Sequence, residues 1–261
     1  MSAELPQGQG IWIWQIRETA EGKPERIAQE CARQGFAHGL IKCADGAADY
    51  APNRALDHSV CQALRNRGVQ AIGWGYHYGE RPEAEAMAAA AACRRLGLRT
   101  YLLNAEREFE RPGGADRLRR WIEAFRRELG QQAALGLSTF ALPQAHPSFP
   151  YQTALSGEGG CDFVSPQIYT TASKRFPFVQ RAQTYWKESK AQLERFAKPI
   201  VPTFRAYLGD GVSDWGFVTR EALAIAASAR QWGAEAFNWW VWQSAQRHEP
   251  LWEALGRNGQ P

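Results

Sequence analysis

Short apolar runs recur along this chain roughly every 30 residues, and stretches of helical composition separate most of them. Strand-sized runs that alternate with helix-sized segments indicate βα units and a parallel sheet. Eight such runs in 261 residues match the size and count of a (β/α)8 barrel, so we predict that residues 1–261 form a single α/β barrel domain. The runs are Gly10–Ile16, His38–Ala44, Gln70–Tyr78, Thr100–Glu106, Ala133–Phe140, Asp162–Tyr169, Pro199–Tyr207 and Glu235–Gln243.

Glycines at the junctions before the runs support this prediction. A helix commonly ends at a residue in the left-handed conformation, which glycine adopts without steric cost. Basic residues precede several of these glycines and suit the negative end of a helix dipole. The glycines are Gly35, Gly68, Gly97, Gly130 and Gly233.

The basic residues do not indicate a nucleic-acid partner. The formal net charge is only +4, and the clusters Arg117–Arg120 and Arg126–Arg127 fall on one predicted helix. We interpret them as a solvated helix face, and no nucleic-acid-binding motif is visible.

The cysteines, the first residues and the length of the apolar runs indicate the cellular compartment that we expect for the chain. The cysteine count, five, is odd, and the spacing matches no zinc or CxxC pattern, so we expect free thiols in a reducing compartment. The first residues carry no basic and apolar leader, and no run reaches the length of a membrane span. We predict a monomer without a membrane span, either cytoplasmic or released without a conventional signal peptide by a phage or a dedicated secretion system.

A barrel of this kind carries its chemistry at the C-terminal ends of its strands. Side chains alternate across a strand, so parity sorts them into inward and outward sets. In the fourth run, Leu103 and Ala105 suit the helix-packed outside. The polar residues Asn104, Glu106 and Glu108 then share the inner face.

The same parity predicts inward side chains in four further runs. The third run offers two alternatives, Trp74, Tyr76 and Tyr78 or the opposite set that contains His77. The inward residues expected from the sixth and seventh runs are Ser165, Gln167, Tyr169, Thr203, Arg205 and Tyr207. The eighth run fits either parity, and we favour Asn238, Trp240 and Trp242 as its inward residues.

This predicted rim of carboxylate, amide, phenol, guanidinium and indole groups suits sugars, whose rings have apolar faces and polar edges. Unpaired polar groups in the barrel cost about 1–3 kcal/mol each, which favours a functional pocket over a buried network around Glu106 and Arg205. Glycosidic cleavage needs a carboxylic acid of raised pKa. Glu106 is so placed, and candidates for a second carboxylate are Glu108, Asp45, Asp210 and Asp214.

The fourth run also carries a family resemblance. Tyr101-x-x-Asn104-x-Glu106-x-Glu108 resembles in spacing the Asp-x-x-Asp-x-Asp-x-Glu motif of family-18 chitinases, and Gln167-Ile-Tyr169 looks like their Met-x-Tyr. The Trp-rich eighth run is similar to their Trp-bearing last strand. Asn104-Ala-Glu106 resembles the Asp-x-Glu of family-25 lysozymes (muramidases), which the compact size and Trp242-Gln243 suit better.

These resemblances imply a TIM-barrel glycoside hydrolase that acts on an N-acetylated glycan such as peptidoglycan or chitin. The chitinase alignment makes Glu108 the general acid and the lysozyme alignment makes it Glu106, which we prefer because it lies nearer the strand end. Tyr101 and Asn104 stand where the families have aspartates, and the first run lacks the lysozymes' strand-one aspartate. A non-catalytic carbohydrate-binding or assembly protein on the same fold is therefore the alternative.

The expected roles of the remaining residues follow from this interpretation. Asn104, Gln167 and Tyr169 would position the substrate or its acetamido group, and Trp240 and Trp242 would form the floor. Tyr76, Tyr78, Arg205 and Tyr207 would form the walls, and Asp45 would also contact the substrate.

Other chemistry has less support in the sequence. A Schiff base on Lys42 is a third hypothesis, although we expect an ion-paired or surface lysine. The histidines His58, His77 and His146 lack metal-ligand spacing, so we predict no metal and no cofactor.

Overall fold

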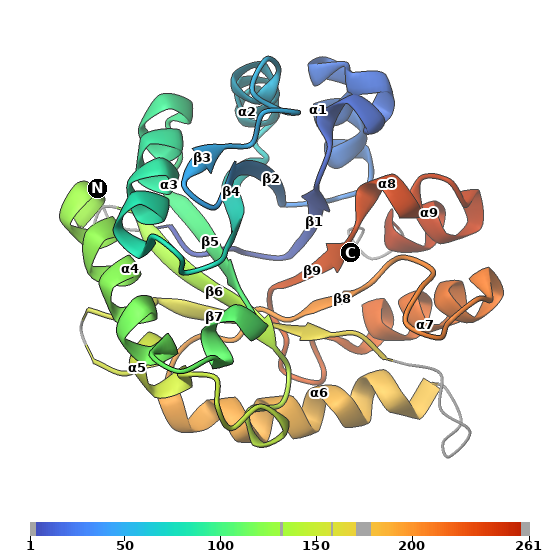
Figure 1. Ribbon diagram of the computed structural model, residues 1–261. Coiled ribbons are helices and arrows are strands. Elements are labelled where there is room, and N and C mark those ends of the chain that lie inside the picture. Colours follow the sequence, from blue (N-terminus) through green and yellow to red (C-terminus); the bar gives the residue numbers. More distant parts are fainter. Residues whose placement is uncertain (1–3, 131–132, 158, 171–178, 257–261) are drawn as a thin grey trace.

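The computed structural model describes residues 4–130, 133–157, 159–170 and 179–256, which form a closed parallel barrel surrounded by helices (Figure 1). The barrel runs β1-β2-β4-β5-β6-β7-β8-β9 and closes where β9 pairs in parallel with β1. This confirms the predicted (β/α)8 fold. The barrel strands are β1 (Gln9–Ile13), β2 (His38–Asp45), β4 (Gln70–His77), β5 (Thr100–Ala105), β6 (Ala134–Phe140), β7 (Phe163–Ile168), β8 (Thr203–Arg205) and β9 (Phe237–Trp240).

Helices follow most of the strands and cover the outside of the barrel (Figure 1). The helices are α1 (Pro24–Arg33), α2 (Asp57–Asn66), α3 (Pro82–Leu96), α4 (Gly114–Leu129), α5 (Tyr151–Leu155), α6 (Val179–Leu193), α7 (Trp215–Ser228), α8 (Trp242–Ala245) and α9 (Glu249–Gly256).

Most strands are shorter than the predicted runs, and one short strand was not predicted. The first strand ends at Ile13, and a short 3-10 helix begins at Ile16. The last strand ends at Trp240, because Trp242–Ala245 turns into helix α8. An unpredicted two-residue strand, β3 (Ala48–Asp49), pairs antiparallel with the end of β2 and forms a hairpin at the barrel mouth.

Glycine positions at helix ends agree with the prediction. Gly97 follows α3 with φ 63°, and its backbone N–H donates to the Arg94 carbonyl, so the residue closes the last helical turn. The other predicted glycines also have a positive φ, namely Gly35, Gly68, Gly130 and Gly233.

The interior of the barrel holds an apolar layer and a polar layer. The apolar side chains come from successive strands and include Trp12, Leu40, Ile72, Leu102, Phe163 and Val201. In the polar layer, His38 Nε2 lies 2.6 Å from Asn238 Oδ1, and Asn238 donates to Ser165 and Thr203. Because these buried polar groups pair with one another, this network stabilises the barrel without a ligand.

Helix α4 carries Arg119 and Arg120 on a solvated face, but the prediction is wrong for Arg126, whose side chain is 10% exposed and donates to the carbonyls of Ala133 and Gly160 and to Asp162. The buried side chains of the helix recur at helical spacing, namely Leu118, Trp121, Ile122 and Phe125. On the other side, Arg119 pairs with Asp116 and Glu123, and Arg120 pairs with Glu83. Carboxylates on the same and the neighbouring helix therefore offset these charges.

The cysteines are free and buried: Cys31, Cys43, Cys61, Cys93 and Cys161. In the described part of the chain, no helix combines the length and apolar character that a bilayer crossing requires.

Candidate active site

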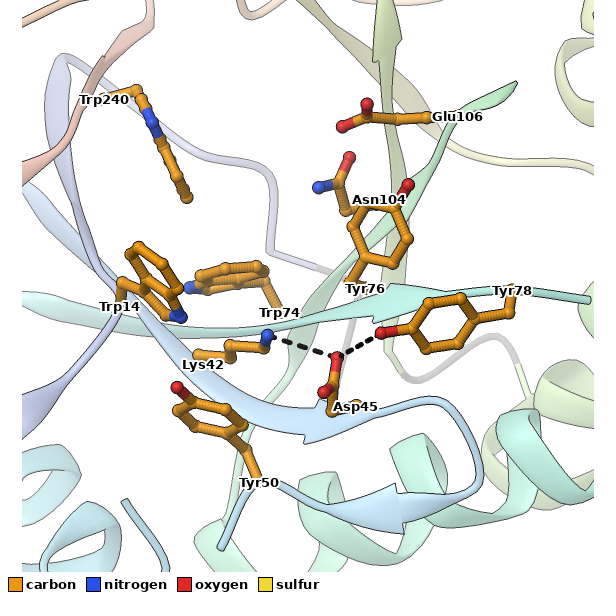
Figure 2. Close-up of a pocket in the computed structure, with 10 residues that line it drawn as sticks. All are labelled: Trp14, Lys42, Asp45, Tyr50, Trp74, Tyr76, Tyr78, Asn104, Glu106 and Trp240. Atoms are coloured by element: carbon orange, nitrogen blue, oxygen red, sulfur yellow. Dashed lines mark hydrogen bonds and ion pairs between the residues drawn. The ribbon is translucent and has the colours of Figure 1, made fainter. Parts of the chain in front are cut away.

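A pocket of about 490 Å³ opens at the C-terminal ends of the barrel strands (Figure 2). Its walls come from β2, β4, β5 and β9 and from the residues that follow β1, β3, β4 and β5. The lining residues are Trp14, Lys42, Asp45, Tyr50, Trp74, Tyr76, Tyr78, Asn104, Glu106 and Trp240. Its size and aromatic lining are typical of small-molecule sites.

Glu106 lies directly after the last residue of β5 and is half-buried in the pocket wall. Gln167 Nε2, on β7, donates to its carboxyl group at 2.9 Å. With its amide nitrogen directed at the neighbouring oxygens, Asn104 donates to Glu106 and to the Ser138 carbonyl, each at 3.2 Å. Two neutral amides thus fix the carboxyl group in the pocket.

The surroundings raise the pKa of Glu106 above its ordinary value. Burial disfavours the charged form, and the like charge of Glu108 acts in the same direction. The hydrogen bonds from Gln167 and Asn104 stabilise the carboxylate and oppose this shift. A carboxyl group that keeps its proton to higher pH can act as a proton donor.

Glu108 occupies a different position. It belongs to the 3-10 helix Arg107–Glu110, is buried, and does not line the pocket. The Tyr76 hydroxyl donates to its carboxylate at 2.8 Å. Tyr76 therefore lies in the pocket wall with Glu108 as its partner, and Glu106 is the carboxyl group of this pair that faces the pocket.

A second carboxylate, Asp45 at the end of β2, lines the same pocket. Lys42 Nζ forms an ion pair with it at 3.2 Å, and the Tyr78 hydroxyl lies 3.5 Å from the same oxygen (Figure 2). The Lys42 ammonium lies over the rings of Tyr50 and Trp74. Burial lowers the pKa of Lys42, while Asp45 opposes that shift. The lysine is ion-paired, as the sequence led us to expect.

Tryptophans form the wall opposite Glu106 (Figure 2). Trp74 and Trp240 pack edge-to-face at 5.6 Å between ring centroids, and Trp12 packs against both from the barrel interior. Trp14 stacks on Trp240 and keeps 41% of its surface exposed. The structure also decides the parity of β4, because Trp74 and Tyr76 point inward while His77 packs against Trp121 in the helix layer.

The expected placement of Trp242 in the pocket is wrong. The ring is 1% exposed, donates to Gln246, and packs against Trp252 in the helix layer. The reason is that the strand ends at Trp240, so the alternation that directs Trp240 inward does not continue to Trp242.

The predicted residues at the β7–β8 side lie together but outside this pocket. Arg205 is 1% exposed and donates to the carbonyls of Thr170 and Gly209, and it pairs with Asp210 at 3.3 Å. Tyr207 also donates to Asp210, and Tyr169 packs edge-to-face on Tyr207. Arg205 does not contact Glu106, contrary to the buried network that the sequence left open. It organises the loop after β8.

Sequence reasoning did not assign Trp14 or Tyr50 to the site. Parity within the first run pairs Trp14 with Trp12 and could have found it. Tyr50 comes from the unpredicted hairpin and carries no comparable signal.

Among the residues that the structure describes, no group of three or more His, Cys, Asp or Glu side chains could hold a metal ion. The fold and the pocket together define a (β/α)8 barrel with an aromatic site at its mouth and a protonatable carboxyl group in the wall.

Comparison with known proteins finds the same fold in solved structures. No protein-family model and no curated protein sequence matches the chain. The spore cortex-lytic enzyme SleL of Bacillus cereus is similar in structure, with a TM-score of 0.66 and 10% identity over 97% of this chain and 74% of that one.

Two further solved structures are similar in the same way. A GH18 chitinase from Pseudoalteromonas aurantia has a TM-score of 0.64 and 11% identity over 97% of this chain and 100% of its own. An endocellulase from Pyrococcus horikoshii has a TM-score of 0.66 and 10% identity over 96% and 92%. The likeness shows a shared barrel fold. Function has to be argued from the site itself.

Proposed function

We propose that this protein is a glycoside hydrolase that acts on an N-acetylated glycan, of the peptidoglycan or chitin type, with Glu106 as general acid. The observation that carries the proposal is the position of Glu106: its carboxyl group has a raised pKa, is held by two amides, and faces a pocket walled by tryptophans and tyrosines. The activities of the barrels with similar structure, a cortex-lytic enzyme and a chitinase among them, support this reaction class.

In this mechanism, protonated Glu106 donates its proton to the glycosidic oxygen as the bond from that oxygen to C1 breaks. The two nearby carboxylates are each held by another side chain, Asp45 by Lys42 and Glu108 by Tyr76. We therefore assign the nucleophile to the carbonyl oxygen of the substrate's own N-acetyl group. That oxygen forms a bond to C1 as the leaving group departs. Water then attacks C1, the bond from C1 to the acetyl oxygen breaks and restores the N-acetyl group, and the water gives its proton to the Glu106 carboxylate, which restores the acid.

The aromatic wall suits the apolar faces of sugar rings. Trp240, beside the exposed Trp14, would stack against the substrate, and Tyr76 and Tyr78 would contact its hydroxyl groups. Asn104 and Gln167 act through Glu106, so we assign them the role of positioning its carboxyl group.

The test measures release of reducing ends from chitin oligosaccharides and from peptidoglycan, each compared with its de-N-acetylated form. Cleavage that needs the acetyl group is the expected result. Equal cleavage of both forms would remove the acetamido nucleophile and make Asp45 the second carboxylate.

A sugar-binding barrel without activity is the second candidate, because Tyr101 and Asn104 occupy two positions at which the resembling families have aspartates. Tyr101 is buried in the helix layer with its hydroxyl 2.9 Å from His77 Nε2, away from the pocket. Saturable binding of these glycans with no cleavage of any of them would establish this candidate.

A further inference from the structure

A second pocket adjoins the candidate active site. Its volume is about 330 Å³, and its walls come from the segment after β1, the loop after β8, and helix α8. Trp14 and Trp240 line both pockets. The remaining walls include Tyr207, Gln243, Ser244 and Arg247.

The shared tryptophans form the boundary between the two pockets. Their ring centroids are 6.4 Å apart and their planes differ by 26°, so the two indoles stack nearly parallel to each other. Trp14 is 41% exposed although its ring is large and apolar. An exposed indole at a pocket edge indicates a contact surface, since its burial by a ligand would be favourable.

Helix α8 holds this surface in place. Gln243 accepts a hydrogen bond from the Trp14 backbone N–H and donates to the Gln15 carbonyl. The segment that carries Trp14 is thus tied to the helix that forms the far wall of the second pocket. A binding surface fixed before the ligand arrives loses less conformational entropy on binding.

The polar groups of the second pocket lie at its rim. Arg247 pairs with Glu18 at 3.5 Å, and both side chains are largely exposed. The second pocket therefore combines an aromatic wall with hydrogen-bonding groups at its edge, as the first pocket does. The carboxylate among its described lining residues is Glu18, which is exposed and paired with Arg247, whereas Glu106 is half-buried and held by two amides.

We infer that the second pocket is a subsite for further sugar units of the same glycan chain, so that the protein binds an extended stretch of polysaccharide across Trp14 and Trp240. This inference rests on the proposed function. The occupant follows from continuity, because a chain that leaves the first pocket over the shared tryptophans enters the second.

The test measures affinity against chain length by calorimetry in the Glu106→Gln background, which prevents turnover. The probes are N-acetylglucosamine oligomers from the disaccharide to the hexasaccharide, with peptidoglycan glycan strands as a second series. Affinity should rise with length, and Ser244→Trp, which fills the second pocket, should lower hexasaccharide affinity by about tenfold and leave the disaccharide unaffected.

Leu223→Trp is the matched control, because it adds the same indole at an exposed position that lines neither pocket. Thermal melts check that each variant folds. Trp14→Ala removes an exposed ring and provides an independent variant, which should reduce the gain in affinity with length.

The outcomes separate the two proposals. Oligomers that bind with the same affinity at every length, unaffected by Ser244→Trp and Trp14→Ala, would overturn the second subsite and leave the proposed function standing. Absence of binding for every oligomer and strand would overturn the proposed function, and this inference with it.

Discussion

The two sides of the barrel mouth carry similar chemical groups and use them differently. At the β2–β5 side, Asp45, Tyr76 and Glu106 line a pocket. At the β7–β8 side, the guanidinium of Arg205 and the carboxylate of Asp210 bind each other and the surrounding loop. The sequence predicted that residues of both sides contact the substrate.

The difference has a physical cause. A buried guanidinium has five N–H donors that need acceptors, and Arg205 makes four hydrogen bonds, to the backbone carbonyls of Thr170, Tyr207 and Gly209 and to the Asp210 carboxylate. The loop after β8 consequently folds around Arg205. Glu106 instead accepts hydrogen bonds from two neutral amides, which hold it in place without a counter-charge. In this barrel, an inward polar residue at a strand end is therefore available to a ligand where the loop after its strand does not already supply its hydrogen-bond partners.

The largest effect that we expect for the β2–β5 side is on turnover. Glu106→Gln keeps the shape of the side chain and removes the proton donor, so hydrolysis should fall by about 10²–10⁴-fold while glycan binding stays nearly intact. Initial rates and calorimetric affinities on the same oligosaccharides measure the two quantities. Glu108→Gln is the matched control and should lose less than about tenfold. The reverse order would assign the acid to Glu108, as in the chitinase-like alignment.

The next effect separates the two tryptophans of the last run. Trp242→Ala removes a fully buried ring and should lower the free energy of unfolding by about 3–5 kcal/mol, with glycan affinity unchanged in the folded fraction. Trp240→Ala should weaken glycan binding more than it weakens folding, because the ring lines both pockets. Denaturant melts and binding isotherms on both variants decide this. A steep loss of stability with unchanged affinity for Trp240→Ala would place that ring in the core.

A smaller effect tests the structural role of the β8 arginine. Arg205→Met leaves the carbonyls of Thr170 and Gly209 without their charged donor and should cost about 1.5–3 kcal/mol of folding free energy in urea unfolding. Arg220→Met is the control, since its ion pair with Asp214 is exposed, and should change stability by less than about 0.5 kcal/mol. Unchanged stability together with weaker disaccharide binding would show that Arg205 contacts the substrate after all.

The smallest effect is a shift in pH dependence. In the proposed mechanism turnover requires protonated Glu106, so the rate should fall as pH rises through its raised pKa. Glu108→Gln removes a like charge, so this alkaline limb should move to lower pH. A pH–rate profile on each protein measures it, and a limb that moves to higher pH would contradict the assigned interaction.

The same raised pKa predicts a pH-dependent contribution to stability. The folded state binds the Glu106 proton more tightly than the unfolded chain, whose Glu pKa is about 4.3. The free energy of unfolding should therefore decrease as pH rises from that value to the folded pKa. Glu106→Gln should lack this decrease in denaturant titrations at several pH values.

The sequence by itself determined the architecture and one wall of the pocket. Alternation within a strand is local, with a period of two residues, so the residue pattern alone assigned Asn104, Glu106 and Gln167 to the inner face. Regular spacing and glycine at the helix ends are equally local signals, and they predicted the closed barrel.

Only the tertiary structure decided which of these inward residues line a pocket. The bond from Gln167 to Glu106 joins residues 61 positions apart, and Trp14 meets Trp240 across the closure between β1 and β9. Because β9 ends at Trp240, Trp242 turns away from the pocket. The β2–β3 hairpin brings the Tyr50 ring against the Lys42 ammonium. These contacts depend on which residues, distant in the sequence, become the hydrogen-bonding and packing partners of each inward side chain. A local pattern of residues carries no information about those partners.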